Sequence, residues 1–255
     1  IFLGYELGFL ILLAFWSYVR GFQPRIEGLE KFMDLGFVNS ILRTKWFPPA
    51  DMWFAGESIN YYYFGHLQAA VLTKLSGLSS AITYNLQMAT LFALTFTSGF
   101  SLVSNLILKG IKQKGDKLRR QVKKNIVVGG IVAALLLTLG GNLHAAVYVL
   151  KDGAKTYWYP DATRFIGYEP DNPDDATIHE FPAYSFVVSD LHGHLNDLPT
   201  VLLFMAVLIV WGLSLKEKKL IFDEFYFDQL DINKLGLEYF GLAFLLAVMY
   251  MTNSW

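Results

Sequence analysis

Five long apolar runs constrain the fold of this chain more than any other feature of its sequence. They cover residues 1–18, 82–108, 126–149, 198–215 and 236–253. A helix needs about 20 mostly apolar residues to cross the roughly 30 Å hydrocarbon core of a bilayer, and each run is close to that length or longer. We therefore predict an all-α, polytopic helical membrane protein. We expect residues 1–255 to form a single membrane domain, the N-terminal part of a longer protein.

Composition supports a membrane location. Hydrophobic residues make up 54% of the chain and charged residues 17%, whereas soluble domains average about 45–50% and about 25%. The chain has no cysteine, which excludes thiol catalysis and Cys-ligated metal centres. A net charge of −1 gives no reason to expect a nucleic-acid partner. The expected partner is the lipid bilayer, and composition leaves the oligomeric state undetermined.

The distribution of charge predicts the topology. Residues 109–124 are rich in Lys and Arg, and short basic loops stay in the cytoplasm. The loops 19–81 and 150–197 are then external, and the N-terminus of this multi-pass cell-membrane protein is cytoplasmic. A weaker apolar run, residues 60–77, could instead cross the bilayer and reverse the N-terminus. We favour a flat placement on the outer surface, because the aromatic residues 61–64 suit the membrane interface.

The first external loop combines an amphipathic pattern with acidic residues. Apolar residues recur at helical spacing over residues 28–43, which predicts a helix lying on the membrane. Glu27, Glu30 and Asp34 are spaced by three and four, so their carboxylates share one helix face. Two interpretations remain open. The carboxylates form a solvated polar face, or one of them points into an active site at the membrane surface.

The second external loop contains three of the five histidines, within HEFPAYSFVVSDLHGHLND at residues 179–197. In an extended backbone Asp190, His192 and His194 project from one face, because the side-chain period is two. Such a set could ligate manganese, iron or zinc. The same residues could instead bind phosphate or transfer a proton, or they could be polar residues with a purely structural role.

Three segments carry a resemblance to a known family. They read EKFMDLGFVNSILR, FPPADMWFAGESINYYYFGH and EFPAYSFVVSDLHGH. Together they resemble the YYY membrane proteins, an uncharacterised prokaryotic family of multi-spanning proteins named for a triple tyrosine, here residues 61–63. Members of that family are usually much longer than 255 residues, which agrees with the expectation that this chain is part of a longer protein.

A more remote resemblance is to the GT-C membrane glycosyltransferases. In that superfamily a first span is followed by an external acidic motif, a surface helix, a Pro-Pro element, an aromatic surface helix and a second span, and the order here is similar. The resemblance implies a GT-C-like fold with amphipathic surface helices in the first external loop. The acidic motif falls near Glu30 or Asp34, but the usual adjacent Asp-Glu pair is absent, since Lys31 follows Glu30.

The GT-C resemblance implies transfer of a sugar from a polyprenyl-phosphate donor to an envelope acceptor on the outer face. We assign the catalytic base to Asp34, with Glu30 and Asp51 as alternatives. The phosphate would be bound by Asp190, His192 and His194. These side chains would contact it directly or through a divalent metal (Mn, Mg or Zn) that they ligate. The residues assigned to substrate binding are Tyr61, Tyr62, Tyr63, His66, Arg25, Arg43 and Glu180, with Arg164 as a further cation.

Two other functions are compatible with the sequence. One is a transporter or a membrane protein that binds lipid or an envelope polymer. Transporters usually place ionisable residues near the middle of the membrane, whereas most charge here lies in loops. The other is a metal-dependent hydrolase of the envelope, which would keep an open coordination position on its metal.

Overall fold

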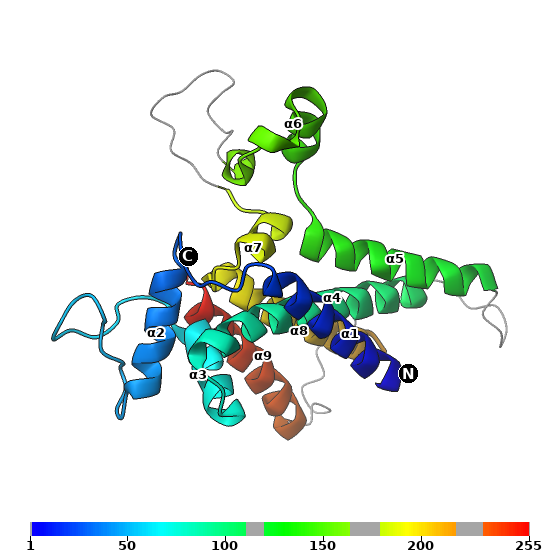
Figure 1. Ribbon diagram of the computed structural model, residues 1–255. Coiled ribbons are helices and arrows are strands. Elements are labelled where there is room, and N and C mark those ends of the chain that lie inside the picture. The colour runs from blue at the N-terminus through cyan, green and yellow to red at the C-terminus, as the bar shows by residue number, and fades with distance from the viewer. Residues whose placement is uncertain (1, 111–119, 164–178, 218–231, 255) are drawn as a thin grey trace, which may run out of the picture.

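The computed structural model describes residues 2–110, 120–163, 179–217 and 232–254 (Figure 1). All regular elements in these ranges are helical, which confirms the all-α prediction. Arg164, the middle of the basic segment (residues 111–119) and Lys218 lie outside the described residues. The α-helices are α1 (Phe2–Gly21), α2 (Lys31–Arg43), α3 (Phe64–Ser76), α4 (Ser80–Gly110), α5 (Arg120–Leu139), α6 (His144–Asp152), α7 (Pro182–Val188), α8 (Gly193–Glu217) and α9 (Ile232–Thr252), with short 3-10 turns η1 (Ala154–Thr156) and η2 (Tyr159–Thr163).

Within the described residues, four helices are long and apolar enough to cross a membrane. Their apolar stretches are Leu3–Gly21, Ser80–Gly110, Gln121–Leu139 and Gly193–Leu213. The fifth predicted span corresponds to α9, whose described apolar part, Gly236–Thr252, is shorter than these four. The chain is therefore a polytopic helical membrane protein.

Two predicted elements differ in extent from the observed ones. The predicted span 126–149 ends at Leu139, and His144–Asp152 forms the separate helix α6. The sequence Gly-Gly-Asn at residues 140–142 explains the break, because glycine favours departure from helical geometry. The predicted surface helix 28–43 begins only at Lys31, because Gly28 and Leu29 have φ values of 77° and 49°.

Helix α3 answers the question raised by residues 60–77. It has 13 residues, which corresponds to about 20 Å, and it is not among the described helices that could cross a bilayer. It packs against α2, α4, α8 and α9. Residues 60–77 therefore add no further span.

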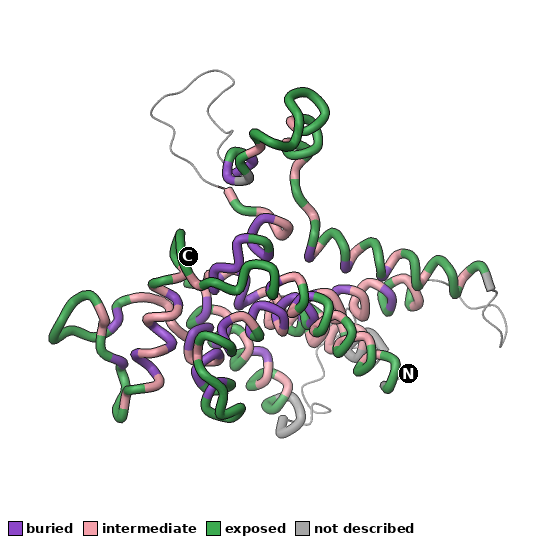
Figure 2. Tube along the Cα trace, viewed as in Figure 1, coloured by how far each residue is buried: buried purple, intermediate pink, exposed green. Residues whose placement is uncertain are grey.

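The core lies where α1, α4 and the short helix α7 meet. Trp16 stacks on Phe92 with ring centroids 4.1 Å apart, and Phe186 meets both rings edge-on. Helix α4 is the central helix and contacts α1, α5 and α8. The outward faces of α1, α5 and α9 instead carry exposed Leu, Ile, Val and Phe (Figure 2). Such apolar outer surfaces are expected where helices face lipid.

The connections place both predicted external loops at one end of the bundle. At that end Arg20, the last basic residue of α1, hydrogen-bonds Asn85 near the start of α4 at 2.7 Å. At the opposite end, Tyr5 of α1, Lys109 of α4 and Leu213 of α8 line a common groove. The chain segments before α4 and before α8 thus lie at the same end, opposite the end of α4 that leads into the basic segment. The cytoplasmic assignment of that basic segment stays a prediction.

Substitution of Gly193 tests the packing at the start of α8. A Cβ atom there would meet the ring of Tyr62 and would lie 2.7 Å from the carbonyl oxygen of Thr252. Overpacking of this kind costs about 1–3 kcal/mol, so we expect Gly193→Ala to lower the thermal unfolding midpoint in detergent. Gly212→Ala is the matched control, because it lies on the same helix and has nothing within 4 Å. Equal midpoints for the two variants would contradict the packing described.

Candidate functional site

The carboxylate of Asp34 joins four separate parts of the chain. It lies on α2, and its side chain is 1% exposed. His66 of α3 donates from Nε2 to Oδ1 at 2.8 Å, and the backbone N–H of Leu191 donates to Oδ2 at 2.8 Å. The hydroxyl of Tyr84 on α4 lies 3.2 Å from Oδ2. Asp34 therefore fixes the turn between α7 and α8 against the first external loop.

That turn is further held by its own side chains. Ser189 ends α7 in the left-handed region, with φ 61°, and its hydroxyl donates to the carbonyl of Phe186 at 2.7 Å. The buried Asn196 donates from Nδ2 to the carbonyl of Leu191 at 2.6 Å. His192 is thereby fixed just before α8, and His194 lies in the first turn of that helix.

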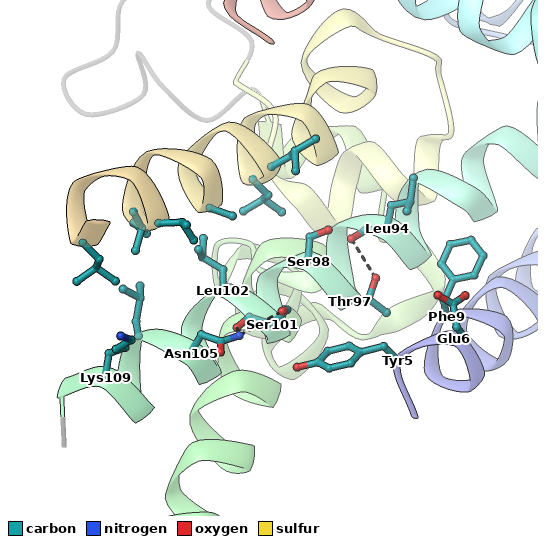
Figure 3. Close-up of a pocket in the computed structure, with 17 residues that line it drawn as sticks. Tyr5, Glu6, Phe9, Leu94, Thr97, Ser98, Ser101, Leu102, Asn105 and Lys109 are labelled. Carbon is teal, nitrogen blue, oxygen red and sulfur yellow. Dashed lines mark hydrogen bonds between the residues drawn. The ribbon is translucent and has the colours of Figure 1, made fainter. Parts of the chain in front are cut away.

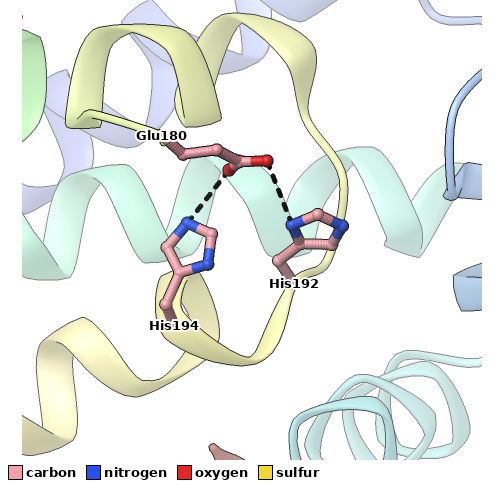
Figure 4. Close-up of side chains that lie close together, drawn as sticks. All are labelled: Glu180, His192 and His194. Atoms are coloured by element: carbon pink, nitrogen blue, oxygen red, sulfur yellow. Dashed lines mark ion pairs between the residues drawn. The ribbon is translucent and has the colours of Figure 1, made fainter. Parts of the chain in front are cut away.

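Glu180, His192 and His194 form a compact group at this turn (Figure 4). Glu180 Oε1 lies 3.4 Å from His192 Nδ1, and Glu180 Oε2 lies 3.2 Å from His194 Nε2. The hydroxyl of Ser185 donates to Glu180 Oε2 at 2.9 Å and lies 3.1 Å from His194 Nε2. On its other edge, His192 Nε2 donates to Glu30 Oε2 of the first loop at 2.8 Å. Acidic and imidazole groups from the two loops therefore share one site.

The charges of this group reinforce one another. Burial favours neutral His192 and would lower its pKa, but the hydrogen bond and charge of Glu180, with Glu30 nearby, raise that pKa to about 9. Burial would also raise the pKa of Glu180, yet the hydrogen bonds and charges of His192 and His194 hold it well below its ordinary value. Without a bound metal, the group is thus a carboxylate facing a protonated imidazole at neutral pH.

Asp190 lies outside this group, contrary to the predicted set of Asp190, His192 and His194. The prediction required an extended backbone from Asp190 to His194, whereas helix α8 begins at Gly193. The residue is 5% exposed. Burial, followed by repulsion from Asp34, raises its pKa to about 7. Burial has the opposite effect on the pKa of nearby Lys31, which it lowers because burial disfavours the charged ammonium group. The negative charge of Asp190 acts against this shift. In the observed group, Glu180 takes the place that the sequence assigned to Asp190.

The triple tyrosine borders a pocket beside the histidines. The hydroxyl of Tyr61 donates a hydrogen bond to the hydroxyl oxygen of Tyr62 at 2.6 Å. Burial together with this hydrogen bond raises the pKa of Tyr61. Tyr62 in turn lies against Gly193, between the two histidines in sequence. The pocket has a volume of about 720 Å³. Its lining comprises Phe47, Ile59, Asn60, Tyr61, Tyr62, Tyr63, Phe64, Leu67, Tyr250, Met251 and Ser254.

Several residues assigned to catalysis or binding have other surroundings. Asp34 and His66 each have side chains 1% exposed and bond to each other, so neither can touch a substrate in this structure. Asp51 accepts hydrogen bonds from the backbone of Trp53 and Phe54 and shapes an exposed turn. The remaining assigned cations lie on the first loop: Arg25 pairs with Glu27 at 3.5 Å, and Arg43 lies 3.4 Å from the hydroxyl of Ser40.

Three residues of the site were not singled out from the sequence. Tyr84 lies within an apolar run, and nothing in that run distinguishes it from a tyrosine that faces lipid. Asn196 follows His192 by four residues, and that spacing could have indicated a side chain capping the turn. Ser185 lies one helical turn before Ser189, in the same short segment as the histidines.

A second cavity, of about 600 Å³, lies among the membrane-spanning helices (Figure 3). Helix α8 supplies an apolar wall, and α4 supplies polar side chains that include Thr97, Ser101 and Asn105. Its nearest residue on α8 is Leu202, about 12 Å along the helix axis from His194. This groove is therefore separate from the group around His192.

One protein family matches the chain over its whole length. The family described as uncharacterized membrane protein (DUF2298) matches residues 1–255. The chain belongs to the DUF2298 family. No curated protein and no solved structure matches this family member. The family assignment agrees with the helical membrane architecture and gives no activity, so the chemistry of this DUF2298 protein is argued from its site.

Removal of the Asp34 carboxylate is expected to destabilise the protein strongly. Asp34→Ala leaves the buried donors of His66 and Leu191 without their acceptor, whereas the hydroxyl of Tyr84 keeps the carbonyl oxygen of Ser189 at 3.1 Å; breaking a buried pair costs about 3–5 kcal/mol. Asp34→Asn keeps one acceptor oxygen, so its loss should be smaller. Thermal unfolding and amide hydrogen exchange at Leu191 measure both effects. Asp51→Ala, which removes the carboxylate of an exposed turn, is the control and should leave exchange at Leu191 unchanged. Wild-type exchange in Asp34→Ala would contradict the role of this carboxylate.

The raised pKa values predict that the metal-free protein loses stability as pH rises. The pKa of Asp190 is about 7 in the folded protein and 3.8 in the unfolded chain. The pKa of His192 is about 9 in the folded protein and 6.5 in the unfolded chain. Each group lowers stability between its two values by at most about 1.4 kcal/mol per pH unit. The lowered pKa of Glu180 contributes stability that is constant above its ordinary value of 4.5.

Thermal unfolding with a chelator present, from about pH 5.5 to about pH 9, measures this trend. Asp190→Asn should flatten the profile below about pH 7 and leave the decline above it. A wild-type profile that rises over this range, or a variant profile identical to wild type, would contradict the assignment.

Proposed function

We propose that this protein is a membrane glycosyltransferase that transfers a sugar from a polyprenyl-phosphate donor to an envelope acceptor at the outer membrane surface. The observation that carries the proposal is the contact between Glu30 of the first loop and His192 of the second at 2.8 Å. A carboxylate and a cationic imidazole at the end of a helical bundle provide a base and a phosphate-binding charge in one place. Both are groups that this transfer requires.

Glu30 is the best candidate for the base. Its side chain is 51% exposed, whereas Asp34 is enclosed. One oxygen, Oε2, holds His192, and the other is available to take the proton from an acceptor hydroxyl. In the proposed reaction the acceptor oxygen bonds to the anomeric carbon of the sugar while the bond from that carbon to the phosphate oxygen breaks. The products are the glycoside and polyprenyl phosphate, with the acceptor proton on Glu30.

The histidine pair supports the leaving phosphate in this proposal. The raised pKa of His192, about 9, makes it an imidazolium at neutral pH in the absence of metal. His194 is 43% exposed and can donate a hydrogen bond to a phosphate oxygen. Asp34 acts as a positioning residue, because it holds the backbone of Leu191 next to His192.

The aromatic pocket suits the carbohydrate part of the substrates. Tyr61 and Tyr62 present adjacent rings and hydroxyls beside Gly193. Sugars offer both C–H faces and hydroxyl groups, so an amphipathic aromatic wall can contact them along one face and hydrogen-bond at its edge. The positive-inside rule applied to the opposite, basic end of the bundle supports an external location. The cytoplasmic N-terminus belongs to the same proposal.

A metal-dependent hydrolase of envelope lipids or glycans is the second candidate. The observation that favours it is the group of Glu180, His192 and His194, whose composition is also found in hydrolytic zinc sites with an open position. Release of sugar from the lipid donor without any acceptor would indicate this hydrolase. Formation of a glycoside only when an acceptor is added would indicate the transferase.

Neutralising Glu30 should abolish transfer with little effect on folding. We expect Glu30→Gln to lower the transfer rate by about 10²–10⁴-fold, the range typical of a general base. The assay measures sugar transfer from a polyprenyl-phosphate donor in membranes that contain the full-length protein. Glu27→Gln is the matched control, because Glu27 has a similar exposure of 52% and forms an ion pair with the exposed Arg25.

The two variants should have unfolding midpoints close to wild type. Equal loss of transfer in Glu27→Gln and Glu30→Gln, or full activity in Glu30→Gln, would remove Glu30 from the catalytic role.

A further inference from the structure

We propose that Glu180, His192 and His194 bind one divalent transition-metal ion of the zinc type, with Glu30 as an outer-sphere partner of His192. This inference goes beyond the proposed function and does not depend on sugar transfer: with the ion bound, the metal in place of a protonated His192 would supply the positive charge next to the phosphate. The sequence pointed to a metal near the histidines, but the structure supplies a different carboxylate. The carboxylate of Glu180 lies between the two histidines (Figure 4), and the orienting partner of His192, Glu30, comes from the other loop.

The spacing of the ligand atoms is the first argument. Glu180 Oε1 and His192 Nδ1 are 3.4 Å apart, and Glu180 Oε2 and His194 Nε2 are 3.2 Å apart. Zinc bonds of about 2.0–2.2 Å to nitrogen and oxygen place neighbouring ligand atoms about 3.3 Å apart in a tetrahedron. Charge-assisted hydrogen bonds between nitrogen and carboxylate oxygen are shorter, about 2.7–2.9 Å. The three residues each offer one ligand atom, and these atoms all lie within 4.8 Å of one another, so a single ion can contact all three residues.

The contact between His192 and Glu30 is the second, independent argument. A metal-bound histidine usually donates its other ring N–H to a carboxylate, which fixes the tautomer and the ring orientation. His192 turns Nδ1 toward Glu180 and donates from Nε2 to Glu30 at 2.8 Å. Ser185 provides a similar support for the carboxylate, since its hydroxyl donates to Glu180 Oε2 at 2.9 Å.

The number and exposure of the ligands indicate an accessible site. Three protein ligands leave a fourth tetrahedral position for water or a substrate oxygen, as in catalytic zinc sites. His194 is 43% exposed, whereas Glu180 and His192 are 23% and 20% exposed. An ion can therefore enter from the His194 side while the other two ligands are already held in place.

The rival explanation is a metal-free ion pair, in which Glu180 balances protonated imidazoles. The two explanations differ in what the purified protein retains. A metal site requires deprotonated histidines and releases protons on binding. An ion pair binds no stoichiometric metal. Metal content therefore separates them without any assay of enzymatic activity.

The test uses the full-length protein in detergent, purified with a tag that contains no histidine, stripped with a chelator and titrated with Zn²⁺. We expect one Zn²⁺ per chain by elemental analysis after desalting. Glu180→Ala and His194→Ala should each weaken Zn²⁺ binding at least about 100-fold. His144→Ala, on the surface helix α6, should bind as wild type does. Glu30→Gln should keep the stoichiometry and weaken affinity by about 10–100-fold, as expected for an outer-sphere carboxylate.

A second variant exchanges one proposed ligand for another metal-binding side chain and reports on the coordination directly. His194→Cys places a thiol in this group, and residues 1–255 contain no other cysteine. With Co²⁺ as the probe, this variant should gain a thiolate-to-cobalt charge-transfer band in the near ultraviolet that wild type lacks. Such a band supports the site even if the alanine variants fold poorly. Absence of stoichiometric Zn²⁺ in wild type, or wild-type affinity in both alanine variants, would overturn the proposal.

Discussion

A single buried carboxylate organises the functional end of this protein. Asp34 accepts hydrogen bonds from α3 and from the turn between α7 and α8, and it contacts α4. A buried acceptor without partners would be strongly unfavourable, so these elements are bound to one arrangement. The position of His192 follows from it, since the neighbouring Leu191 is held by its backbone N–H. The contact between Glu30 and His192 is thus a consequence of the way Asp34 is satisfied.

The sequence predicted the membrane architecture well, because long apolar runs have few structural alternatives. The all-helical fold and the four long apolar helices follow from length and composition alone. The sequence also indicated that residues of the two loops share one site, and Glu30 of the first loop contacts His192 of the second. The ends of elements were less predictable: the break after Leu139 and the late start of α2 at Lys31 depend on local backbone geometry at glycines and at Leu29.

Individual roles within the site were the hardest to predict, for a physical reason. Asp34 and Glu30 differ by one helical turn, and only tertiary packing decides which carboxylate is enclosed and which is exposed. The side-chain alternation assumed for Asp190, His192 and His194 failed because helix α8 begins at Gly193, between the two histidines. The partner of the histidines, Glu180, comes from before α7, ten residues away from Asp190 in sequence. No local pattern encodes that contact.

The bond from the Leu191 amide to Asp34 spans 157 positions of the chain, and this separation affects biogenesis. Ribosomes add about 5–20 residues per second, so Asp34 leaves the ribosome roughly 8 to 30 s before its partner does. During that interval the carboxylate of Asp34 in the first loop is solvated or accepts a hydrogen bond from another donor. Assembly of this end of the bundle therefore follows insertion of the later helices. A nascent chain arrested before α8 would contain α1 and α4 correctly inserted. Its functional end would still be incomplete, because the turn before α8 would not yet contact Asp34.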